Sequence, residues 1–434
     1  MSHYKPYPAY KDSGVEWIGK VPEHWDVVRI RRTAQITTDR CNAIPLGSPY
    51  IGLEDVESGS GQYKPTATAS RQSEDSTVGL FQSGDVLYGK LRPYLRKCIT
   101  VPTGGACSTE FLVLKPVSAA PAWLQNWLLT HDVTQQIEAG CDGAKMPRAD
   151  WEHVGSIHIP IPEKTEQDFI LGALDRETTR IDALIAKKTE FIELLAKKRQ
   201  ALITHAVTKG LDPKARMKDS GVEWIGKVPE HWNVKRLKHL IEEPLQYGAN
   251  ESGDSSIEEG PRYIRITDLD DAGDLRNNSV KRLPPDVAQP YMLNDGDILF
   301  ARSGATVGKT YRYRSAHGPA CFAGYLIRAK LDRKTVNPDF VILAVRSHYY
   351  WAYIQRTAIQ ATIENVGAER YGDFPVAVPS RDEQERIVAE VTSALSRIDL
   401  LVQKTQLSID LLKQRRSALI TAAVTGQIDL RESA

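Results

Sequence analysis

Cysteine and long apolar runs are both scarce in this chain of 434 residues. The five cysteines are scattered and form no Cys-x-x-Cys pair, which argues against a structural zinc site and against a disulfide framework. Nowhere do about 18 apolar residues follow one another, and the N-terminal segment lacks the apolar core of a signal peptide. We therefore expect a cytoplasmic protein that has no membrane among its partners.

The sequence also lacks a net charge that would indicate its partners. Lysine and arginine together number 56 and the acidic residues 55, so a nucleic-acid surface must arise from local clustering. The length is too great for one ordinary core and predicts about two to four domains.

A long internal repeat organises the chain. Fifteen residues, KDSGVEWIGKVPEHW, occupy 11–25 and recur unchanged at 218–232. Two more pairs close the copies: IPIPEKTEQ at 159–167 corresponds to VAVPSRDEQ at 376–384, and ALITHAVT at 201–208 to ALITAAVT at 418–425. The centres between these matched ends diverge, apart from scraps such as GDVLYGK and GDILFAR. A period above 200 residues indicates a duplicated domain pair and excludes a solenoid of short repeats.

Each copy ends in a segment that predicts a long helix. Residues 380–425 contain neither glycine nor proline, and residues 163–209 contain only Gly172. Ser380 and Glu383 have capping-box spacing at the start of the second helix, and Gly426 can end it in a left-handed conformation. The apolar residues form one narrow stripe, which favours an antiparallel coiled coil of the two helices, about 60 Å long at 1.5 Å per residue. The alternative is that each helix packs only on its own domain.

About 150 residues of short segments precede each helix. Strands are predicted at PYIGLEDV, RYIRITDL, DVLYG, DILFA, SIHIPI and FPVAV, and helices near 122–130 and 340–355. The fold class is therefore α+β, with two mixed α+β domains alternating with two long helices in a pseudo-two-fold symmetric arrangement.

These doubled motifs resemble the specificity subunit of type I restriction-modification systems, over nearly the whole chain. The carriers are the repeated SGVEWIGKVPEHW, the strand-to-helix junction ending in Glu-Gln, and the repeated ALITxAVT. The resemblance implies target recognition domains at 1–160 and 213–377, with conserved long helices at 161–212 and 378–434. It further implies that each recognition domain reads one half of a bipartite, asymmetric site in double-stranded DNA. The helices then set the spacing and dock two methyltransferase subunits, to which two restriction (translocase) subunits can be added.

The same resemblance implies a noncatalytic chain without a cofactor of its own. The partner subunits would carry out adenine N6 methylation with S-adenosylmethionine, and use ATP with Mg²⁺ for translocation and cleavage. Matched ends around divergent centres suit this role, because base edges differ between half-sites while the spacing of the backbone does not. The bases recognised and the spacer length are not encoded in any readable pattern.

Clusters of basic residues with tyrosine are the candidate DNA contacts. YGKLRPYLRK at 88–97 and the stretch 302–314 each contain several cations and no acid, and both follow a Gly-Asp turn. A second rank of candidates precedes the last strand of each copy. The full set is Lys90, Arg92, Tyr94, Arg96, Lys97, Lys145, Arg148, Arg302, Lys309, Arg312, Arg314, Asn365 and Arg370. The alternative for each cluster is a solvated strand face.

The repeated tryptophans, Trp17 and Trp25 with Trp224 and Trp232, admit two interpretations. They could stack on bases, but side chains that read different half-sites should differ between the copies. Their identity in both copies favours a structural core or a seam of the scaffold.

Two other classes of protein compete with a DNA reader. SGATVGKT at 303–310 is close to a phosphate-binding loop, which would suit a stand-alone ATPase or nuclease, but Ser303 replaces the first glycine and no helix is predicted after it. NPDF at 337–340 departs from an amino-methyltransferase motif, and Asp286, Asp332 and Lys334 are spaced too widely for a shared metal. The remaining alternative is a coiled-coil scaffold that never touches DNA.

Overall fold

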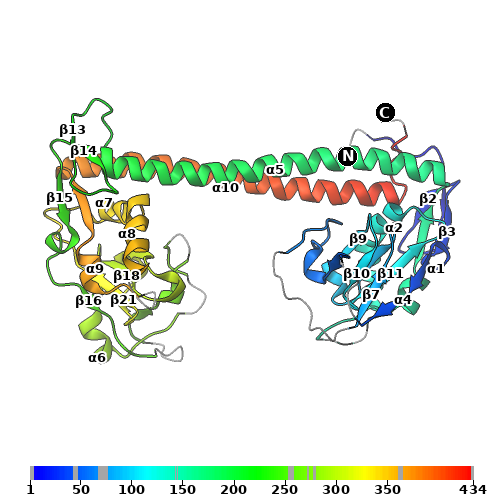
Figure 1. Cartoon of the computed structure of the whole chain (residues 1–434), viewed down its shortest axis with the longest axis horizontal. Helices are drawn as coiled ribbons and strands as arrows, with labels where there is room; N and C mark the ends of the chain where they lie inside the picture. The colour runs from blue at the N-terminus through cyan, green and yellow to red at the C-terminus, as the bar shows by residue number, and fades with distance from the viewer. Residues whose placement is uncertain are drawn as a thin grey trace. The chain divides into compact units, whose positions relative to one another are not determined.

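The computed structural model describes residues 4–42, 47–66, 77–141, 143, 145–252, 259–270, 273–276, 280–359 and 365–431. The chain divides into two compact units, the first formed by Met1–Thr189 with Gln406–Ala434 and the second by Glu190–Thr405. Both divisions fall inside long helices. The boundaries predicted for the recognition domains and helices stay predictions. In Figure 1 the strands of unit 1 are blue to cyan and those of unit 2 green to orange.

Unit 1 combines short strands with short helices and the ends of two long helices. Its strands are β1 (Tyr10–Asp12), β2 (Lys20–Pro22), β3 (Asp26–Arg29), β4 (Ala34–Thr37), β5 (Arg40–Cys41), β6 (Tyr50–Ile51), β7 (Val78–Phe81), β8 (Val86–Gly89), β9 (Cys98–Thr100), β10 (Gly105–Cys107), β11 (Phe111–Pro116) and β12 (His158–Ile161). Its helices are α1 (Ile30–Thr33), α2 (Pro121–Leu128), α3 (His131–Ala139) and α4 (Trp151–Ser156), with 3-10 turns η1 (Leu53–Asp55) and η2 (Pro93–Leu95). The long helix α5 (Lys164–Lys209) follows.

Unit 2 repeats this composition. Its strands are β13 (Met217–Asp219), β14 (Lys227–Pro229), β15 (Asn233–Arg236), β16 (Gln246–Tyr247), β17 (Arg262–Ile264), β18 (Ile298–Ala301), β19 (Thr310–Arg312), β20 (Ala320–Phe322), β21 (Leu326–Ala329) and β22 (Pro375–Val378). Its helices are α6 (Pro285–Ala288), α7 (Pro338–Ala344), α8 (His348–Ile359) and α9 (Ala368–Gly372). Its 3-10 turns are η3 (Leu237–His239), η4 (Ile266–Asp268), η5 (Gln289–Tyr291), η6 (Gly304–Thr306) and η7 (Ser315–His317), and the chain ends in the long helix α10 (Arg381–Val424).

The two units share the strand order of their main sheet, although the second sheet has four strands in unit 1 (β5-β7-β10-β6) and two in unit 2 (β17-β20). A four-stranded sheet runs β4-β11-β8-β9 in unit 1 and β16-β21-β18-β19 in unit 2, with all pairs antiparallel. An antiparallel pair that leads into a long helix recurs as β3 with β12 and as β15 with β22. A parallel pair recurs as β6 with β10 and as β17 with β20. Duplication, inferred from the matched ends, therefore extends through the divergent centres.

Both segments that their composition predicts to be long helices are helical, as α5 and α10. Gly426 follows α10 with a φ of 72°, the left-handed conformation expected there. Ser380 Oγ accepts a hydrogen bond from the Glu383 amide at 3.4 Å. In unit 1, Arg416 of α10 forms an ion pair with Asp182 of α5 at 3.0 Å, and in unit 2 Arg199 binds Asp399 through two hydrogen bonds. Pairing along the whole length and a pseudo-two-fold axis stay predictions.

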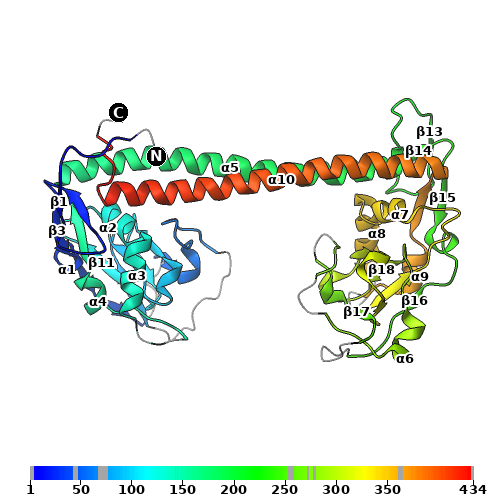
Figure 2. The same ribbon diagram turned by 180° about the vertical axis from the view of Figure 1, so that it is seen from behind.

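The first and last segments that the structure describes belong to unit 1 and lie side by side in the two views of Figures 1 and 2. The Asp429 amide donates to the Lys5 carbonyl at 2.8 Å, and the Tyr10 hydroxyl donates to the Gly426 carbonyl at 3.1 Å. In unit 2 the corresponding place is an unbroken connection from α5 to β13. Unit 1 is therefore completed by two segments that lie on either side of unit 2 in the sequence.

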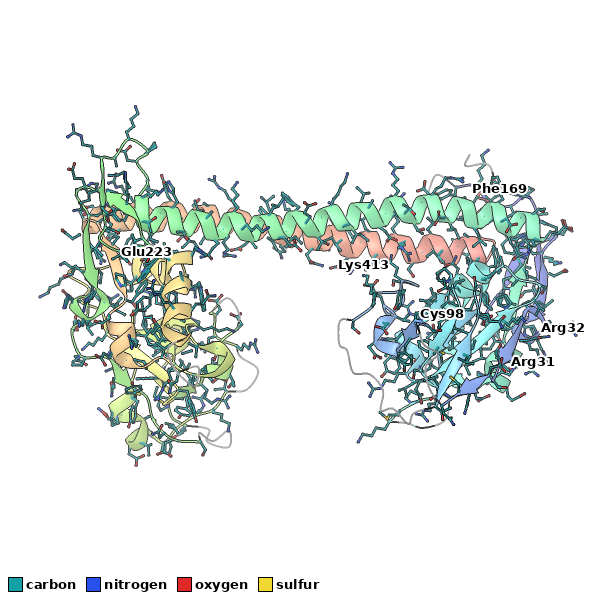
Figure 3. The ribbon with its side chains drawn as sticks, in the orientation of Figure 1. Arg31, Arg32, Cys98, Phe169, Glu223 and Lys413 are labelled. Atoms are coloured by element: carbon teal, nitrogen blue, oxygen red, sulfur yellow. The ribbon has the colours of Figure 1, made fainter. Side chains whose placement is uncertain are left out.

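The repeated tryptophans occupy the cores, as their identity in both copies predicts. Trp25 and Trp232 are 0% exposed, and Trp17 and Trp224 are half-buried against the same two cores. Each core includes residues from both long helices: Ile170 of α5 and Leu419 of α10 in unit 1, for example. Cys98, Cys107 and Cys321 are buried, and Figure 3 labels Cys98 on β9. A base-stacking role for Trp25 or Trp232 is excluded by this burial.

The predicted strands differ from the observed ones in one respect. DVLYG, DILFA, SIHIPI and FPVAV contain β8, β18, β12 and β22. PYIGLEDV and RYIRITDL, however, are strands only at their starts, because a carboxylate turns each into a 3-10 helix. Asp55 Oδ2 accepts from the Gly52 amide and Asp268 Oδ2 from the Arg265 amide, at 2.9 and 2.8 Å. The helical pattern at 340–355 contains two helices, α7 and α8.

Candidate nucleic-acid interface

A Gly-Asp turn sets the start of the strand that carries the main basic candidate in each unit. Gly84 and Gly296 have φ values of 88° and 91°, which favour glycine. The next residue is a buried aspartate whose Oδ2 closes the turn, accepting from the Gln82 amide at 2.8 Å in unit 1 and from the Asn294 amide at 2.9 Å in unit 2. The turn therefore fixes where β8 and β18 begin and where their last residues emerge.

Asp297 makes the stability of unit 2 depend on pH. Burial raises the pKa of this carboxyl to about 6, although the Asn294 amide and Arg328 partly oppose the shift. A pKa above the ordinary value means that protonated Asp297 stabilises the fold fully below pH 3.8, and that this contribution is lost as the pH rises through about 6. Asp297→Asn is neutral at every pH. We expect its free energy of unfolding, relative to that of the parent, to rise by about 1–2 kcal/mol from pH 5 to pH 7, and by little more up to pH 8.

Urea unfolding at pH 5, 7 and 8 measures this difference. Asp295→Asn is the matched control, because hydrogen bonding to the Ser315 amide and the charges of Arg312 and Arg333 lower the pKa of Asp295 despite some burial. The stability that ionised Asp295 contributes is lost only at more acidic pH. The difference in unfolding free energy between Asp295→Asn and the parent should therefore stay constant from pH 5 to pH 8. A flat difference for Asp297→Asn would contradict the prediction.

In unit 1 the structure brings the two ranks of candidates together. Lys90 directly follows β8, its amide donates to the Glu110 carbonyl and its carbonyl accepts from the Ala149 amide, both at 2.9 Å. Leu91 forms a β-bridge with Arg148, whose guanidinium binds Glu110 at 2.9 Å. Lys90 is half-buried, and Arg148 is exposed. Segments 58 residues apart thus meet next to the end of β8, with Glu110 beside the two cations.

The neighbouring candidates of unit 1 divide into exposed and tied side chains. Arg92 and Tyr94 are exposed, whereas Arg96 donates to the Leu129 carbonyl at 3.4 Å and Lys97 Nζ to the Leu53 carbonyl at 2.6 Å. Arg92 and Arg96 have φ values of 53° and 47° on either side of η2, a conformation that is costly for residues with a Cβ. Strain of this kind clusters at functional sites, which supports the loop as a contact region. Lys145, which lies in the same segment as Arg148, is exposed.

Unit 2 places Arg302 at the position of Lys90. Its amide donates to the Tyr325 carbonyl, its carbonyl accepts from the Val366 amide, and the next residue, Ser303, forms a β-bridge with Asn365. Arg302 Nε lies 3.4 Å from the Asn365 Oδ1, and its guanidinium lies 4.8 Å from the centre of the Tyr247 ring. The same double attachment in both units makes Lys90 and Arg302 the best-positioned members of the candidate set.

The other candidates of unit 2 are less accessible than the sequence predicts. Arg312 lies in β19 with its side chain only 10% exposed, paired with Asp339 at 3.2 Å and Asp295 at 3.6 Å. Arg314 is exposed but shares Asp339 at 3.1 Å. Lys309 is half-buried before β19, and Arg370 is exposed on α9. Acids distant in sequence therefore neutralise part of a stretch that contains none itself.

The Glu-Gln junction, which lies in the first turn of each long helix, has a structural role that its sequence did not reveal. Gln167 Oε1 accepts from the Ala120 amide at 2.8 Å and its Nε2 donates to the Pro162 carbonyl at 2.9 Å. Gln384 does the same with the Asn337 amide and the Pro379 carbonyl. The preceding glutamates bind histidines of the repeated motif: His24 with Glu166 at 2.8 Å, His231 with Glu383 at 2.9 Å. The junction therefore fastens the start of each long helix to the strands and helices that precede it.

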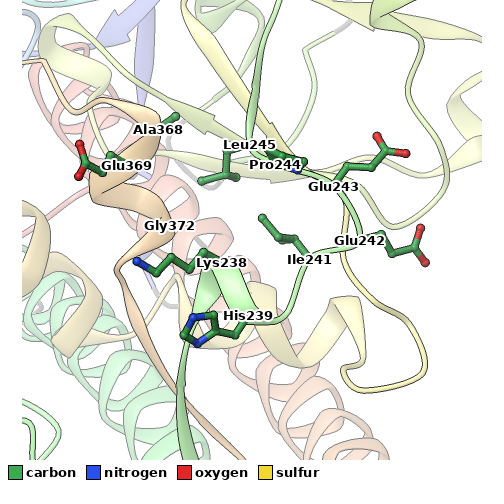
Figure 4. A pocket seen from close by; sticks show the side chains of 10 residues that line it. All are labelled: Lys238, His239, Ile241, Glu242, Glu243, Pro244, Leu245, Ala368, Glu369 and Gly372. Atoms are coloured by element: carbon green, nitrogen blue, oxygen red, sulfur yellow. The ribbon is translucent and has the colours of Figure 1, made fainter.

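A hollow of about 540 Å³ in unit 2 lies between the segment 238–245 and α9 (Figure 4). Its floor is apolar, with Ile241, Pro244 and Leu245, and its rim carries Glu242, Glu243 and Glu369 beside Lys238 and His239. Three carboxylates at the rim repel phosphate, so this hollow does not suit contact with a DNA backbone.

The alternative catalytic interpretations find no support. The segment 303–310 contains η6 and leads into strand β19, and so no helix N-terminus is available to bind phosphate there. Among the residues that the structure describes, no three His, Cys, Asp or Glu side chains are grouped as metal ligands. Within the same ranges no helix is both long and apolar enough to cross a bilayer.

Comparisons with known proteins follow the same direction. No family model matches the chain. It is 21% identical over 429 residues to the type I restriction enzyme MjaVIII specificity subunit of Methanocaldococcus jannaschii, covering 95% of each chain. It is 22% identical over 285 residues to the EcoBI specificity subunit of Escherichia coli, covering 62% of this chain and 58% of that one.

Solved structures share the fold. A chain from a study of complex assembly and conformational transition of the type I R-M system matches with a TM-score of 0.70 at 20% identity, over 94% of this chain and 99% of that one. The HsdS subunit from Thermoanaerobacter tengcongensis matches with a TM-score of 0.51 at 19% identity, over 94% and 98%. The resemblance carried by the doubled motifs is confirmed: the curated homologues are type I restriction enzyme specificity subunits, and the fold is that of HsdS.

Proposed function

We propose that this chain is the noncatalytic DNA-recognition subunit of a type I restriction-modification complex. Each unit reads one half of a bipartite, asymmetric site, and the paired helices set the distance between the halves. Two methyltransferase subunits with S-adenosylmethionine, and restriction subunits with ATP and Mg²⁺, supply the chemistry. The observation that carries the proposal is the duplicated fold, in which matched scaffolds hold a basic side chain at the same place, Lys90 or Arg302, within otherwise divergent surfaces.

Phosphate contact and base reading need different residues in this proposal. The equivalent Lys90 and Arg302 lie at a place fixed by main-chain hydrogen bonds and suit contacts common to both half-sites. The exposed residues around them differ in type: Arg92 and Tyr94 in unit 1, Asn365 and Arg370 in unit 2. Arginine and asparagine can each bond a purine edge with two hydrogen bonds, which makes these side chains candidates for sequence readout.

The exposed faces of the long helices support docking of partner subunits. Eight large apolar side chains on α5 and α10 are 39–60% exposed: Phe169, Leu184, Phe191, Leu194, Leu400, Leu401, Leu407 and Leu411. Figure 3 labels Phe169 on α5 and Lys413 on α10. Contiguous exposed apolar surface marks protein interfaces, so in this proposal the docked subunits cover these side chains.

Exchange of one divergent centre tests the proposal. Residues 27–158 are replaced by the corresponding segment of a relative of different specificity, and the chain is produced with its methyltransferase subunits. Long-read sequencing of methylated adenines should show one half of the recognised sequence changed, with the other half and the spacer retained, because the junction residues Gln167 and Gln384 are untouched.

The reciprocal exchange of residues 234–375 is the matched control and should change only the other half. An unchanged methylation pattern in both chimeras would favour a scaffold that does not read DNA. A recognised sequence that forms one uninterrupted word would contradict the bipartite proposal.

A further inference from the structure

Unit 2 contains a small cavity with an unusual concentration of guanidinium groups. It has a volume of about 210 Å³ and lies between the loop at Gly273, strand β19 and helix α7. Arg312, Arg314 and Arg346 line it, together with Tyr311, His317 and Asp274. Pockets for organic ligands usually measure about 300–1,000 Å³, so this volume suits a small ion better.

Unit 1 serves as an internal reference, because the shared topology identifies the equivalent residues. In the registers of the two sheets Val86 pairs with Thr100 and Ile298 with Arg312, so Thr100 is the counterpart of Arg312. Helices α2 and α7 both begin at the residue after the main-chain amide that the junction glutamine binds. Counting from there, Gln125 corresponds to Ile342 and Leu129 to Arg346.

The equivalent space in unit 1 is closed by a side-chain amide. Gln125 Oε1 accepts from the Thr100 amide at 2.5 Å, and its Nε2 donates to the Gly61 carbonyl at 3.3 Å. Gly61 lies at the same turn as Gly273. Each has a φ between 70° and 80° and comes two residues before a β-bridge, formed by Tyr63 with Val56 and by Leu275 with Leu269. Ile342 has no amide with which to close the space in unit 2, and arginines stand where unit 1 has Thr100 and Leu129.

The arginines of this cavity have acidic partners, yet some of the buried donors around it lack a hydrogen bond. Asp339 binds Arg312 and Arg314, and Asp295 binds Arg312 and Arg333. Asp274 in the lining and Asp270 act on Arg346, so each of the three arginines that line the cavity has acids near it. Among the described residues, Arg312 Nη1 and the Tyr311 hydroxyl are buried without a hydrogen-bond partner.

Crowding of like charges is costly in a buried place. Burial lowers the pKa of Arg312 and of Arg346, and the charge of Arg314 lowers both further. A bound anion would offset this cost and accept charge-assisted hydrogen bonds from several guanidinium groups at once. Planar guanidinium groups match the geometry of phosphate oxygens in particular.

We propose that the cavity of unit 2 lined by Arg312, Arg314 and Arg346 binds a small oxyanion of the phosphate class. This site does not depend on the proposed DNA recognition. It also differs from a DNA-backbone contact, because the Arg312 side chain is nine-tenths buried and held by two acids. The phosphoryl group can come from inorganic phosphate or from a mononucleotide.

Titration of the full chain tests the site. Isothermal titration with inorganic phosphate, and thermal unfolding in phosphate and in chloride of equal ionic strength and pH, should show saturable binding and a rise in unfolding temperature. Arg346→Leu introduces the residue type of unit 1 and should weaken phosphate binding about tenfold or more. Ile342→Gln introduces the closing amide without removing a charge and should do the same. Arg29→Leu, an exposed arginine of unit 1, is the matched control and should bind like the parent.

A second arm with AMP distinguishes the sources. Equal dependence of phosphate and AMP binding on Arg346 indicates a site for the phosphoryl group alone, whereas binding of AMP only indicates a nucleotide; both support the proposal. A rise in unfolding temperature that is equal in the parent, Arg346→Leu and Ile342→Gln reflects general salt effects and overturns it. Binding of duplex DNA without binding of either small anion overturns it as well. If Arg346→Leu does not fold, Ile342→Gln still decides.

Discussion

Replacing Trp25 with alanine is expected to remove about 3–5 kcal/mol of the folding free energy of unit 1. The side chain is 0% exposed and packs edge-on against Trp123, with ring centres 5.4 Å apart, and against Tyr7 at 5.6 Å. Its Nε1 also donates to Glu166 at the start of α5. Native-state hydrogen exchange of amides in β3 and α2 measures the loss. Trp17→Ala is the control: Trp17 is half-buried, and its loss should be well under half as large.

The two equivalent tryptophans should differ when each is replaced by phenylalanine. Trp25 loses a hydrogen bond to a carboxylate, whereas Trp232 Nε1 has no hydrogen-bond partner among the described residues. A hydrogen bond to a charged group contributes about 1.5–3 kcal/mol, so Trp25→Phe should destabilise its unit more than Trp232→Phe destabilises unit 2. Equal losses would show that the bond to Glu166 adds nothing beyond packing.

Replacing Lys90 and Arg302 together with alanine is expected to reduce the affinity of the assembled complex for its DNA site by about 100-fold, or about tenfold for each residue. Main-chain hydrogen bonds on both sides fix each residue at the end of a buried strand, so neither side chain can be replaced by a neighbour. Electrophoretic mobility shifts at several salt concentrations measure the effect. Loss of one phosphate contact lowers the slope of log affinity against log salt by about 1.

The salt slope separates two roles for these residues. A lower slope with unchanged sequence preference assigns phosphate contact, and an unchanged slope with relaxed preference assigns base reading. Lys20→Ala, which removes an exposed lysine of β2, is the matched control and should alter neither. Affinity that is unchanged in the double variant would remove Lys90 and Arg302 from the interface.

Sequence reasoning succeeded where the signal was repeated or local. The long helices, the left-handed Gly426 and the buried Trp25 and Trp232 follow from composition, one special residue and identity between the copies. The adjacency of Lys90 to Arg148 was beyond it, because that contact joins segments separated by several elements and depends on main-chain hydrogen bonds.

Charge clusters were the weakest guide. The stretch containing Arg312 and Arg314 has no acid within it, and so resembles an open cationic surface in sequence. Asp339 and Asp295 approach it from other elements and pair with Arg312, whose side chain the sheet largely buries. The role of Gln167 was equally hidden, because a buried amide that bonds two main-chain groups has no spacing that distinguishes it from a surface glutamine.

The completion of unit 1 by residues that follow unit 2 has a consequence for synthesis on the ribosome. Unit 2 is one continuous stretch, Glu190–Thr405, and its residues emerge together. The core around Trp25 needs Leu419, Ile420 and Val424, which are translated after unit 2. At about 5–20 residues per second the nascent first half waits on the order of 10–40 s between Thr189 and Gln406. Unit 1 thus begins to be made first but completes its core after unit 2. Until then the apolar residues that pack on α10 stay accessible to chaperones.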